Sequence, residues 1–186
     1  MTNIIKNVYC DSCILISWLK KEQRKDPQET EGIKQLINHI QAADLNMITS
    51  VLTKCEVLEC TLTPKAITDL ENVLLRQNVI LADTNEAIWK LTMRLRNYYK
   101  AIHDGLPTLT IPDAVHLATA ITYEADIFYS MDEKDEPRKR RALIPLSGNV
   151  GGYDLKIEKP LALPDLFTGA AIEAGSKKTN ESNSAE

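Results

Sequence analysis

The chain has 186 residues, of which 44% are hydrophobic, and its formal net charge at pH 7 is −4. This apolar content is enough for one domain with a normal core, whereas two domains are unusual at this length. The negative charge argues against a protein that coats nucleic acid by bulk electrostatics, because such binding depends on an excess of Lys and Arg. It leaves room for an enzyme that holds phosphate through a metal ion bound to acidic side chains.

No run of about 18 uncharged apolar residues is present, so no membrane-spanning helix is expected. The start of the chain lacks the basic region, apolar run and cleavage site of a signal peptide. The sequence therefore predicts a cytoplasmic protein.

Four cysteines are present, namely Cys10, Cys13, Cys55 and Cys60. Cys10 and Cys13 have the C-x-x-C spacing of zinc sites and redox pairs. The surrounding run VYCDSCILISWL is apolar on both sides and lacks the Gly or polar turn residues of a zinc knuckle, which favours core thiols. Disulfide bonds are not expected in the cytosol.

Short apolar runs alternate with amphipathic segments along most of the chain. Strands are predicted at residues 4–9, 46–50, 78–82 and 126–130. Helices are predicted at residues 13–22, 33–43, 51–60, 64–74, 87–103 and 113–125. The alternation predicts an α/β fold, with a parallel sheet covered by helices on both faces and ligands outside the carboxyl ends of the strands.

Some segments carry more specific predictions. The apolar stripe expected for the helix at residues 51–60 consists of Val51, Cys55, Leu58 and Leu62. Thr84 supplies half of a capping box for the helix at residues 87–103. Short strands are expected at residues 142–146 and 154–160, followed by a turn at residues 163–167. Residues 1–168 should form the domain, and residues 169–186 lack an apolar period and should form a disordered polar tail.

Four acidic residues occupy related positions in this outline. Asp11 ends the first strand, Glu56 lies in the helix after the second, Asp113 opens a helix, and Asp132 follows the fourth strand. Strand ends and helix starts meet at one edge of such a sheet, and four carboxylates gathered there would repel one another. A hard divalent cation with oxygen ligands, Mg²⁺ or Mn²⁺, is the most economical explanation.

Each acid also has a purely structural interpretation. Asp11 and Asp113 precede helical runs and can act as helix caps or first-turn acids. Glu56 has a rival one turn away in Glu59, and Asp132 can be a turn acid.

Other polar residues are weaker candidates. His116 lies three residues after Asp113 on the same helix face and can present a second ligand, but a partly buried histidine with its hydrogen bonds satisfied is favoured because Mg²⁺ prefers oxygen. Asp104 and Asp135 are outside candidates. The run RKRR at residues 138–141 can clamp RNA phosphates, although such runs more often form a solvated face.

Three segments, in their order and spacing, resemble the PIN-domain family, which includes the VapC-type toxins. They are VYCDSCILISWL, TSVLTKCEVLEC and IPDAVHLATAITYEADIFYSMDEKD, and the resemblance covers about three quarters of the chain. The most specific part is DAVHLATA followed by ADIFYSMD. The stretch RKRRALIPLSGNVGGY is longer than in compact toxins of the family, which is a departure from the toxin pattern.

The resemblance implies a three-layer α/β/α sandwich with a mostly parallel sheet. It implies that Asp11, Glu56, Asp113 and Asp132 are the catalytic metal ligands of an Mg²⁺- or Mn²⁺-dependent ribonuclease acting on single-stranded RNA. Ser130 matches the Ser or Thr position that assists ligation. It also raises the prospect of an antitoxin that inserts a basic side chain at Asp11, Asp113 and Asp132, and of a homodimer formed through the outer helices.

Alternative functions remain open at this point. A haloacid-dehalogenase phosphatase needs an acid where Cys13 stands, and a response-regulator receiver needs adjacent acids after its first strand. The serious alternative is a catalytically silent PIN-like module that binds RNA or protein, because a complete set of acids is necessary for cleavage without being sufficient.

Overall fold

Five strands form the central layer of the structure, a computed structural model that describes residues 5–102, 104–136 and 140–162. The strands are β1 (Asn7–Cys10), β2 (Asn46–Ser50), β3 (Val79–Ala82), β4 (Ile127–Tyr129) and β5 (Lys156–Glu158). They pair in the order β3-β2-β1-β4-β5, and every pairing is parallel. All carboxyl ends therefore lie at the same edge of the sheet.

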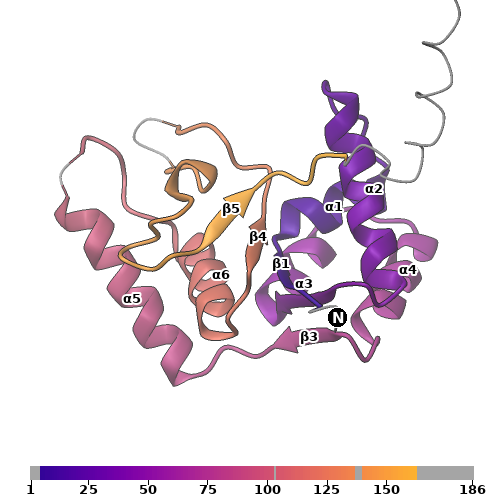
Figure 1. Ribbon diagram of the computed structural model, residues 1–186, viewed down its shortest axis with the longest axis horizontal. Helices are drawn as coiled ribbons and strands as arrows, with labels where there is room; N and C mark the ends of the chain where they lie inside the picture. Colours follow the sequence, from indigo (N-terminus) through magenta and orange to yellow (C-terminus); the bar gives the residue numbers. More distant parts are fainter. Residues whose placement is uncertain (1–4, 103, 137–139, 163–186) are drawn as a thin grey trace, which may run out of the picture.

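Helices cover both faces of this sheet. They are α1 (Ser12–Lys20), α2 (Pro27–Gln41), α3 (Val51–Glu59), α4 (Pro64–Leu74), α5 (Glu86–Ala101) and α6 (Ile111–Thr122). Figure 1 shows α5 and α6 on one side of the strands and α1, α2 and α4 on the other. The predicted α/β/α sandwich with a parallel sheet is confirmed.

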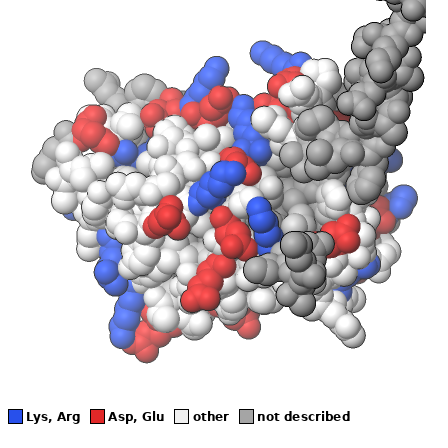
Figure 2. All heavy atoms as spheres, viewed as in Figure 1, with Lys and Arg blue, Asp and Glu red and all other residues white. Residues whose placement is uncertain are grey.

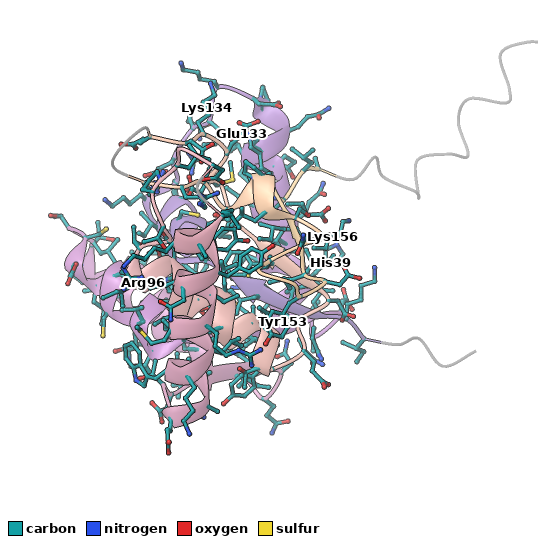
Figure 3. The ribbon with its side chains drawn as sticks, turned by 90° about the vertical axis from the view of Figure 1, so that its left-hand side faces the viewer. His39, Arg96, Glu133, Lys134, Tyr153 and Lys156 are labelled. Atoms are coloured by element: carbon teal, nitrogen blue, oxygen red, sulfur yellow. The ribbon has the colours of Figure 1, made fainter. Side chains whose placement is uncertain are left out.

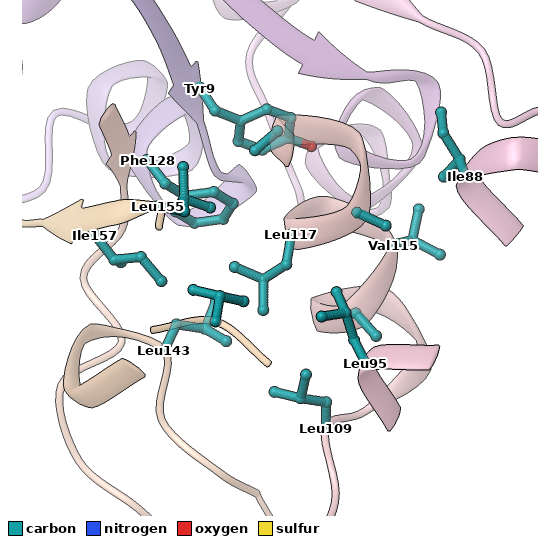
Figure 4. Packing of buried hydrophobic residues seen from close by; sticks show 14 of the residues in the cluster. Tyr9, Ile88, Leu95, Leu109, Val115, Leu117, Phe128, Leu143, Leu155 and Ile157 are labelled. Carbon is teal, nitrogen blue, oxygen red and sulfur yellow. The ribbon is translucent and has the colours of Figure 1, made fainter. Parts of the chain in front are cut away.

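The alternation of side chains along each strand builds two separate cores. In β1, Tyr9 packs into the core formed with α5 and α6, whereas Val8 and Cys10 pack into the core formed with α1, α2 and α4. In β4, Phe128 and Ile127 divide in the same way. Figure 4 shows the first core, in which Tyr9 and Phe128 from the sheet lie near Leu117 of α6.

Two sequence predictions about local structure were wrong. The helix α5 is capped by Asn85 and not by Thr84, because the Asn85 side chain accepts a hydrogen bond from the Ile88 amide. Residues 142–146 contain a 3₁₀ turn, Ile144–Leu146, in place of a strand, while the predicted strand in residues 154–160 is present as β5.

The predicted apolar stripe of α3 was also wrong. The buried residues of this helix are Thr53 and Val57, whereas Cys55 is exposed and Leu58 is 45% exposed. The buried face is partly polar because the Thr53 hydroxyl and amide both make hydrogen bonds with the Ser50 hydroxyl. A pattern of apolar residues cannot report a face of this kind.

The last segment of the described chain runs across α2. Gly32 lies beneath it, and a Cβ atom at this position would collide with the carbonyl oxygen of Pro160. The turn expected at residues 163–167 and the tail expected at residues 169–186 lie outside the described residues. Within the part that is described, no helix is both long and apolar enough to cross a membrane.

Candidate metal site at the carboxyl ends of the strands

A pocket of about 300 Å³ lies at the carboxyl edge of the sheet. Figure 3 marks this end of the molecule by Glu133 and Lys134, the two residues that follow Asp132. The pocket is lined by Asp11, Ser12, Cys13, Arg24, Glu56, Asp113, His116, Met131, Asp132 and Arg140. The structure thus brings all four of the predicted acids together, from segments far apart in the sequence.

Asp11 follows β1 directly and caps α1. Its Oδ1 accepts a hydrogen bond of 2.7 Å from the Ser12 amide, and its Oδ2 accepts one of 2.8 Å from the Ser130 hydroxyl. The same hydroxyl accepts a hydrogen bond from the Asp132 amide. Ser130 therefore orients Asp11 and fixes the backbone of Asp132. Asp11 both caps α1 and lines the pocket, so its two interpretations are compatible.

The Cys13 thiol lies beside Asp11 in the pocket. Its sulfur is 3.2 Å from Asp11 Oδ2 and accepts a hydrogen bond from the Met131 amide. Burial, reinforced by the charge of Asp11, raises the pKa of Cys13 well above its usual value, so the thiol stays protonated. The expectation of core thiols holds for Cys10, which is buried, and fails for the exposed Cys55.

Glu56 of α3 is the last member of a series of hydrogen bonds that runs from Tyr9 through His116. The His116 Nε2 donates to Glu56 Oε2 at 2.9 Å, and His116 Nδ1 shares a hydrogen bond of 2.8 Å with the hydroxyl of Tyr9. Burial lowers the pKa of His116, but the Glu56 hydrogen bond and the nearby carboxylates outweigh burial, and the net pKa is raised. For Glu56, burial acts in the direction of a higher pKa, but the hydrogen bond and charge of His116 outweigh it, and the net pKa is lowered.

Asp113 lies in the first turn of α6 and is held by the residue that caps this helix. The Thr110 hydroxyl donates a hydrogen bond of 2.6 Å to Asp113 Oδ2 and accepts one from the Asp113 amide. Burial raises the pKa of Asp113 despite this bond, and the charge of Asp11 adds to the effect. The helix begins at Ile111, two residues before the predicted start.

Asp132 is buried in the pocket beside a permanently cationic side chain. It is 8% exposed, and its Oδ2 has no hydrogen-bond donor among the described residues. The Arg140 guanidinium lies 2.8 Å from Asp132 Oδ1 as an ion pair. Burial raises the pKa of Asp132 to about 6, with Arg140 opposing the rise and Asp113 and Asp11 increasing it. A buried carboxylate oxygen without a donor fits a bound cation.

One set of donor atoms is compact enough for a single metal ion. An oxygen of Asp11, an oxygen of Glu56 and a nitrogen of His116 all lie within 4.8 Å of one another, whereas Asp113 and Asp132 line the same pocket outside this group. Carboxylate oxygens with one imidazole are a donor set that suits Mg²⁺ or Mn²⁺, whereas a zinc knuckle uses thiolates. His116 has both ring nitrogens engaged, as its structural interpretation predicts.

The outside candidates are used elsewhere in the fold. Asp104 forms a two-point ion pair with Arg141, whose guanidinium also lies over the Tyr99 ring. Asp135 accepts a hydrogen bond from the amide of Ala142. Glu59, the rival of Glu56, is exposed and does not line the pocket.

The RKRR run does not act as one unit. Arg141 is only 3% exposed, so it cannot clamp RNA, and Arg140 lies in the acidic pocket. Arg138 and Lys139 lie outside the described residues. Burial of Arg141 is explained by its ion pair with Asp104, a partner that the sequence pattern does not reveal.

Three contributors to the site were missed by the sequence analysis. Tyr9 and Arg24 carry no local signal, because their roles depend on residues distant in the chain. Thr110 does carry one, since T-I-P-D at residues 110–113 has the spacing of a capping box and places the acid at its third helical position.

The geometry agrees with a comparison of sequences. The pattern of the family described as PIN domain matches residues 8–139, which include all four acids of the pocket. The chain belongs to the PIN-domain family. No curated protein sequence matches this PIN domain significantly.

Solved structures resemble this PIN domain in fold. A toxin–antitoxin complex from Klebsiella pneumoniae has a TM-score of 0.51 and 20% identity, covering 84% of this chain and 99% of that chain. VapBC2 from Rickettsia felis, bound to a promoter DNA fragment, has a TM-score of 0.54 and 12% identity, covering 81% and 98%. FitAB bound to an IR36 DNA fragment has a TM-score of 0.51 and 13% identity, covering 84% and 97%.

Proposed function

We propose that this PIN domain is a metal-dependent ribonuclease that hydrolyses phosphodiester bonds in single-stranded RNA in the cytoplasm. The observation that carries the proposal is the gathering of Asp11, Glu56, Asp113 and Asp132 in one pocket, where Asp132 Oδ2 is buried and lacks a hydrogen-bond donor among the described residues. Such a cluster is costly unless a cation compensates its charge.

The four acids are the proposed ligands of Mg²⁺ or Mn²⁺, with Asp11 and Glu56 belonging to the compact donor group. A divalent ion at this position would lower the pKa of a water molecule and neutralise charge on the phosphate. Ser130 and His116 support the site by holding the carboxylates of Asp11 and Glu56 in fixed orientations.

The proposed partner is a small antitoxin protein that places a basic side chain at Asp11, Asp113 and Asp132. Support comes from the acidic pocket and from the fold shared with the proteins of toxin–antitoxin complexes. A homodimer through the outer helices is supported by α5, on which Trp89 is 45% exposed and Met93 is 51% exposed.

The test is an RNase assay on the purified full chain with labelled single-stranded RNA. EDTA should stop cleavage, and Mn²⁺ or Mg²⁺ should restore it. Asp113→Asn should retain the circular dichroism spectrum and lose at least about 100-fold in cleavage rate, because removing a ligand should exceed the 10–100-fold effect of disturbing its support. Asp83→Asn, at an exposed acid outside the pocket, is the matched control and should behave as wild type.

Cleavage that survives exhaustive chelation would contradict the metal-dependent mechanism. A protein that cleaves no RNA with either ion, and whose melting temperature neither ion changes, would support the silent PIN-like binding module instead. Co-expression with the adjacent reading frame tests the partner separately, since a chain that is harmless to its host and purifies alone would leave a ribonuclease without an antitoxin.

A further inference from the structure

Two arginines line the acidic pocket together with the four carboxylates. Among the described lining residues, Arg24 and Arg140 are the permanently cationic side chains. Arg24 comes from the loop between α1 and α2, and Arg140 comes from the segment after β4. The two cations therefore reach one pocket from different parts of the chain.

Both arginines are held in place and yet remain accessible. The Arg24 amide donates to the Thr30 hydroxyl at 2.9 Å, and its Nη2 donates to the Ser17 hydroxyl at 2.6 Å. The backbones of Arg140 and Glu136 exchange two hydrogen bonds, which anchor Arg140 close to Asp132. The side chains of Arg24 and Arg140 are 28% and 42% exposed, so each can meet a ligand that enters the pocket.

Neither guanidinium has all of its donors satisfied. The Nε atoms of Arg24 and Arg140 are buried and have no hydrogen-bond acceptor in the described part of the chain. Each guanidinium offers five N–H donors in a planar fork that matches the oxygens of a phosphate. Because the two side chains are partly exposed, an acceptor-rich ligand in the pocket can pair with guanidinium donors other than the buried Nε atoms.

The charge of the pocket bears on whether a phosphate can bind there. Four ionised carboxylates carry four negative charges, of which one divalent ion neutralises two. Without the arginines, a pocket holding one ion would repel an RNA phosphate. Arg24 and Arg140 reduce this repulsion, while each also lies near a further glutamate, Glu22 at 3.7 Å and Glu136 at 3.9 Å. The face of the molecule in Figure 2 carries interspersed acidic and basic side chains without a broad basic patch.

We propose that Arg24 and Arg140 bind backbone phosphates of the RNA strand and thereby hold it over the acidic pocket. This inference rests on the proposed ribonuclease function. Arg140 shares its guanidinium between Asp132 and the phosphate. Arg24 keeps its contacts with Ser17 and Glu22 through Nη2 and offers its remaining donors. Because both contacts are to phosphates, they contribute affinity and position without reading the base sequence.

The test compares Arg24→Gln, Arg140→Gln and the double variant with wild type. Binding of a fluorescein-labelled single-stranded RNA 20-mer is measured by anisotropy in Ca²⁺, and cleavage is measured in Mn²⁺. Each single variant should raise Kd and KM about ten-fold with a smaller change in kcat. Each should also reduce the slope of log Kd against log salt concentration by about 0.7, as expected for one phosphate contact on a single strand.

Three controls separate this role from others. Arg94→Gln removes a cation that lies near the Tyr153 ring and not in the pocket, so it should leave Kd unchanged. Arg24→Lys and Arg140→Lys retain the charge and should restore most of the affinity. Arg140→Gln should bind Mn²⁺ at least as tightly as wild type in calorimetry, because Arg140 competes with metal for Asp132.

A double variant with the KM, Kd and salt dependence of wild type would overturn the inference while leaving the ribonuclease proposal intact. Arg140→Gln with weakened Mn²⁺ binding would also overturn it for Arg140, since the loss would then arise at the metal site. A wild-type protein that neither binds nor cleaves the RNA would refute the proposed function, and the inference with it.

Discussion

Asp132 is a residue at which folding stability conflicts with the proposed metal binding. Its side chain is buried at the carboxyl edge of the sheet, beside the carboxylates of Asp11 and Asp113. Arg140 compensates part of its charge, but its pKa is still about 6, well above the usual 3.8. The metal-free protein therefore takes up a proton at Asp132 more readily than the unfolded chain does.

We predict the pH dependence of stability from this shift. At Asp132 the folded state binds more protons than the unfolded state between about pH 4 and pH 6, so the contribution of this residue to the free energy of unfolding falls as pH rises through this window. Asp132→Asn should reduce the slope of unfolding free energy against pH. The contribution of Asp113, whose pKa is also raised, should remain. In EDTA at pH 7.5 the variant should be more stable than wild type, by at most about 3 kcal/mol.

Urea unfolding in EDTA from pH 4 to pH 8 measures this effect, with Asp83→Asn as the exposed control. Mn²⁺ should raise the melting temperature of wild type more than that of Asp132→Asn. A variant that is less stable than wild type at pH 7.5 would show that the ion pair with Arg140 outweighs the cost of burying the carboxylate.

At the scale of elements, β1, α3 and α6 are joined through one chain of hydrogen bonds. Tyr9 of β1 is fully buried, stacks on Phe128 with ring centroids 4.8 Å apart, and contacts His116 of α6 through its hydroxyl. His116 in turn holds Glu56 of α3. These hydrogen bonds fix the orientation of the Glu56 carboxylate relative to the sheet.

Tyr9→Phe should remove the hydroxyl while preserving the ring stack. The expected loss is about 1 kcal/mol of unfolding free energy, together with a Mn²⁺ affinity a few-fold weaker, because His116 loses a partner that orients it. In a Glu56→Gln background the same change should have no further effect on Mn²⁺ affinity, since the chain would no longer end on a carboxylate.

Tyr98→Phe, at an exposed tyrosine, serves as the control for loss of a phenol hydroxyl. Calorimetric titration with Mn²⁺ measures the affinities. Equal effects of Tyr9→Phe in the wild-type and Glu56→Gln backgrounds would mean that Tyr9 does not act through Glu56.

At the scale of the whole molecule, the buried cores lie between Val8 and Ile157. The strand β5 closes the sheet through its pairing with β4, and Ile157 belongs to the core beneath α5 and α6. The domain needed for folding thus extends through β5.

Deletion of residues 170–186 should leave the melting temperature and RNA cleavage nearly unchanged, because these residues offer little apolar surface to bury. Deletion of residues 156–186 is the contrasting truncation and should unfold the protein, since it removes β5 and a buried isoleucine. Thermal melts of both proteins measure the difference. A large loss of stability in the shorter deletion would show that the tail packs on the domain.

The sequence by itself determined the layers of this fold. The short run NMITS encodes a strand buried on both faces, as in a parallel sheet covered by helices. The amphipathic segment at residues 64–74 encodes a helix with one buried face, because positions on one face of a helix recur about every 3.6 residues. Parallel strands then place their carboxyl ends at one edge. The meeting of Asp11 and Asp132 near that edge follows from their positions directly after strands.

Only the tertiary structure decided which polar groups meet one another. The contacts of Tyr9 with His116, Arg140 with Asp132 and Arg141 with Asp104 join different segments, and residue periodicity carries no information about such pairs. The same limit explains why the apolar stripe predicted for α3 was wrong: Thr53 is buried because it forms hydrogen bonds with Ser50. The hydrophobic effect is non-directional, so the periodicity of apolar residues predicts much of the burial, whereas satisfaction of a polar group depends on the geometry of its partner.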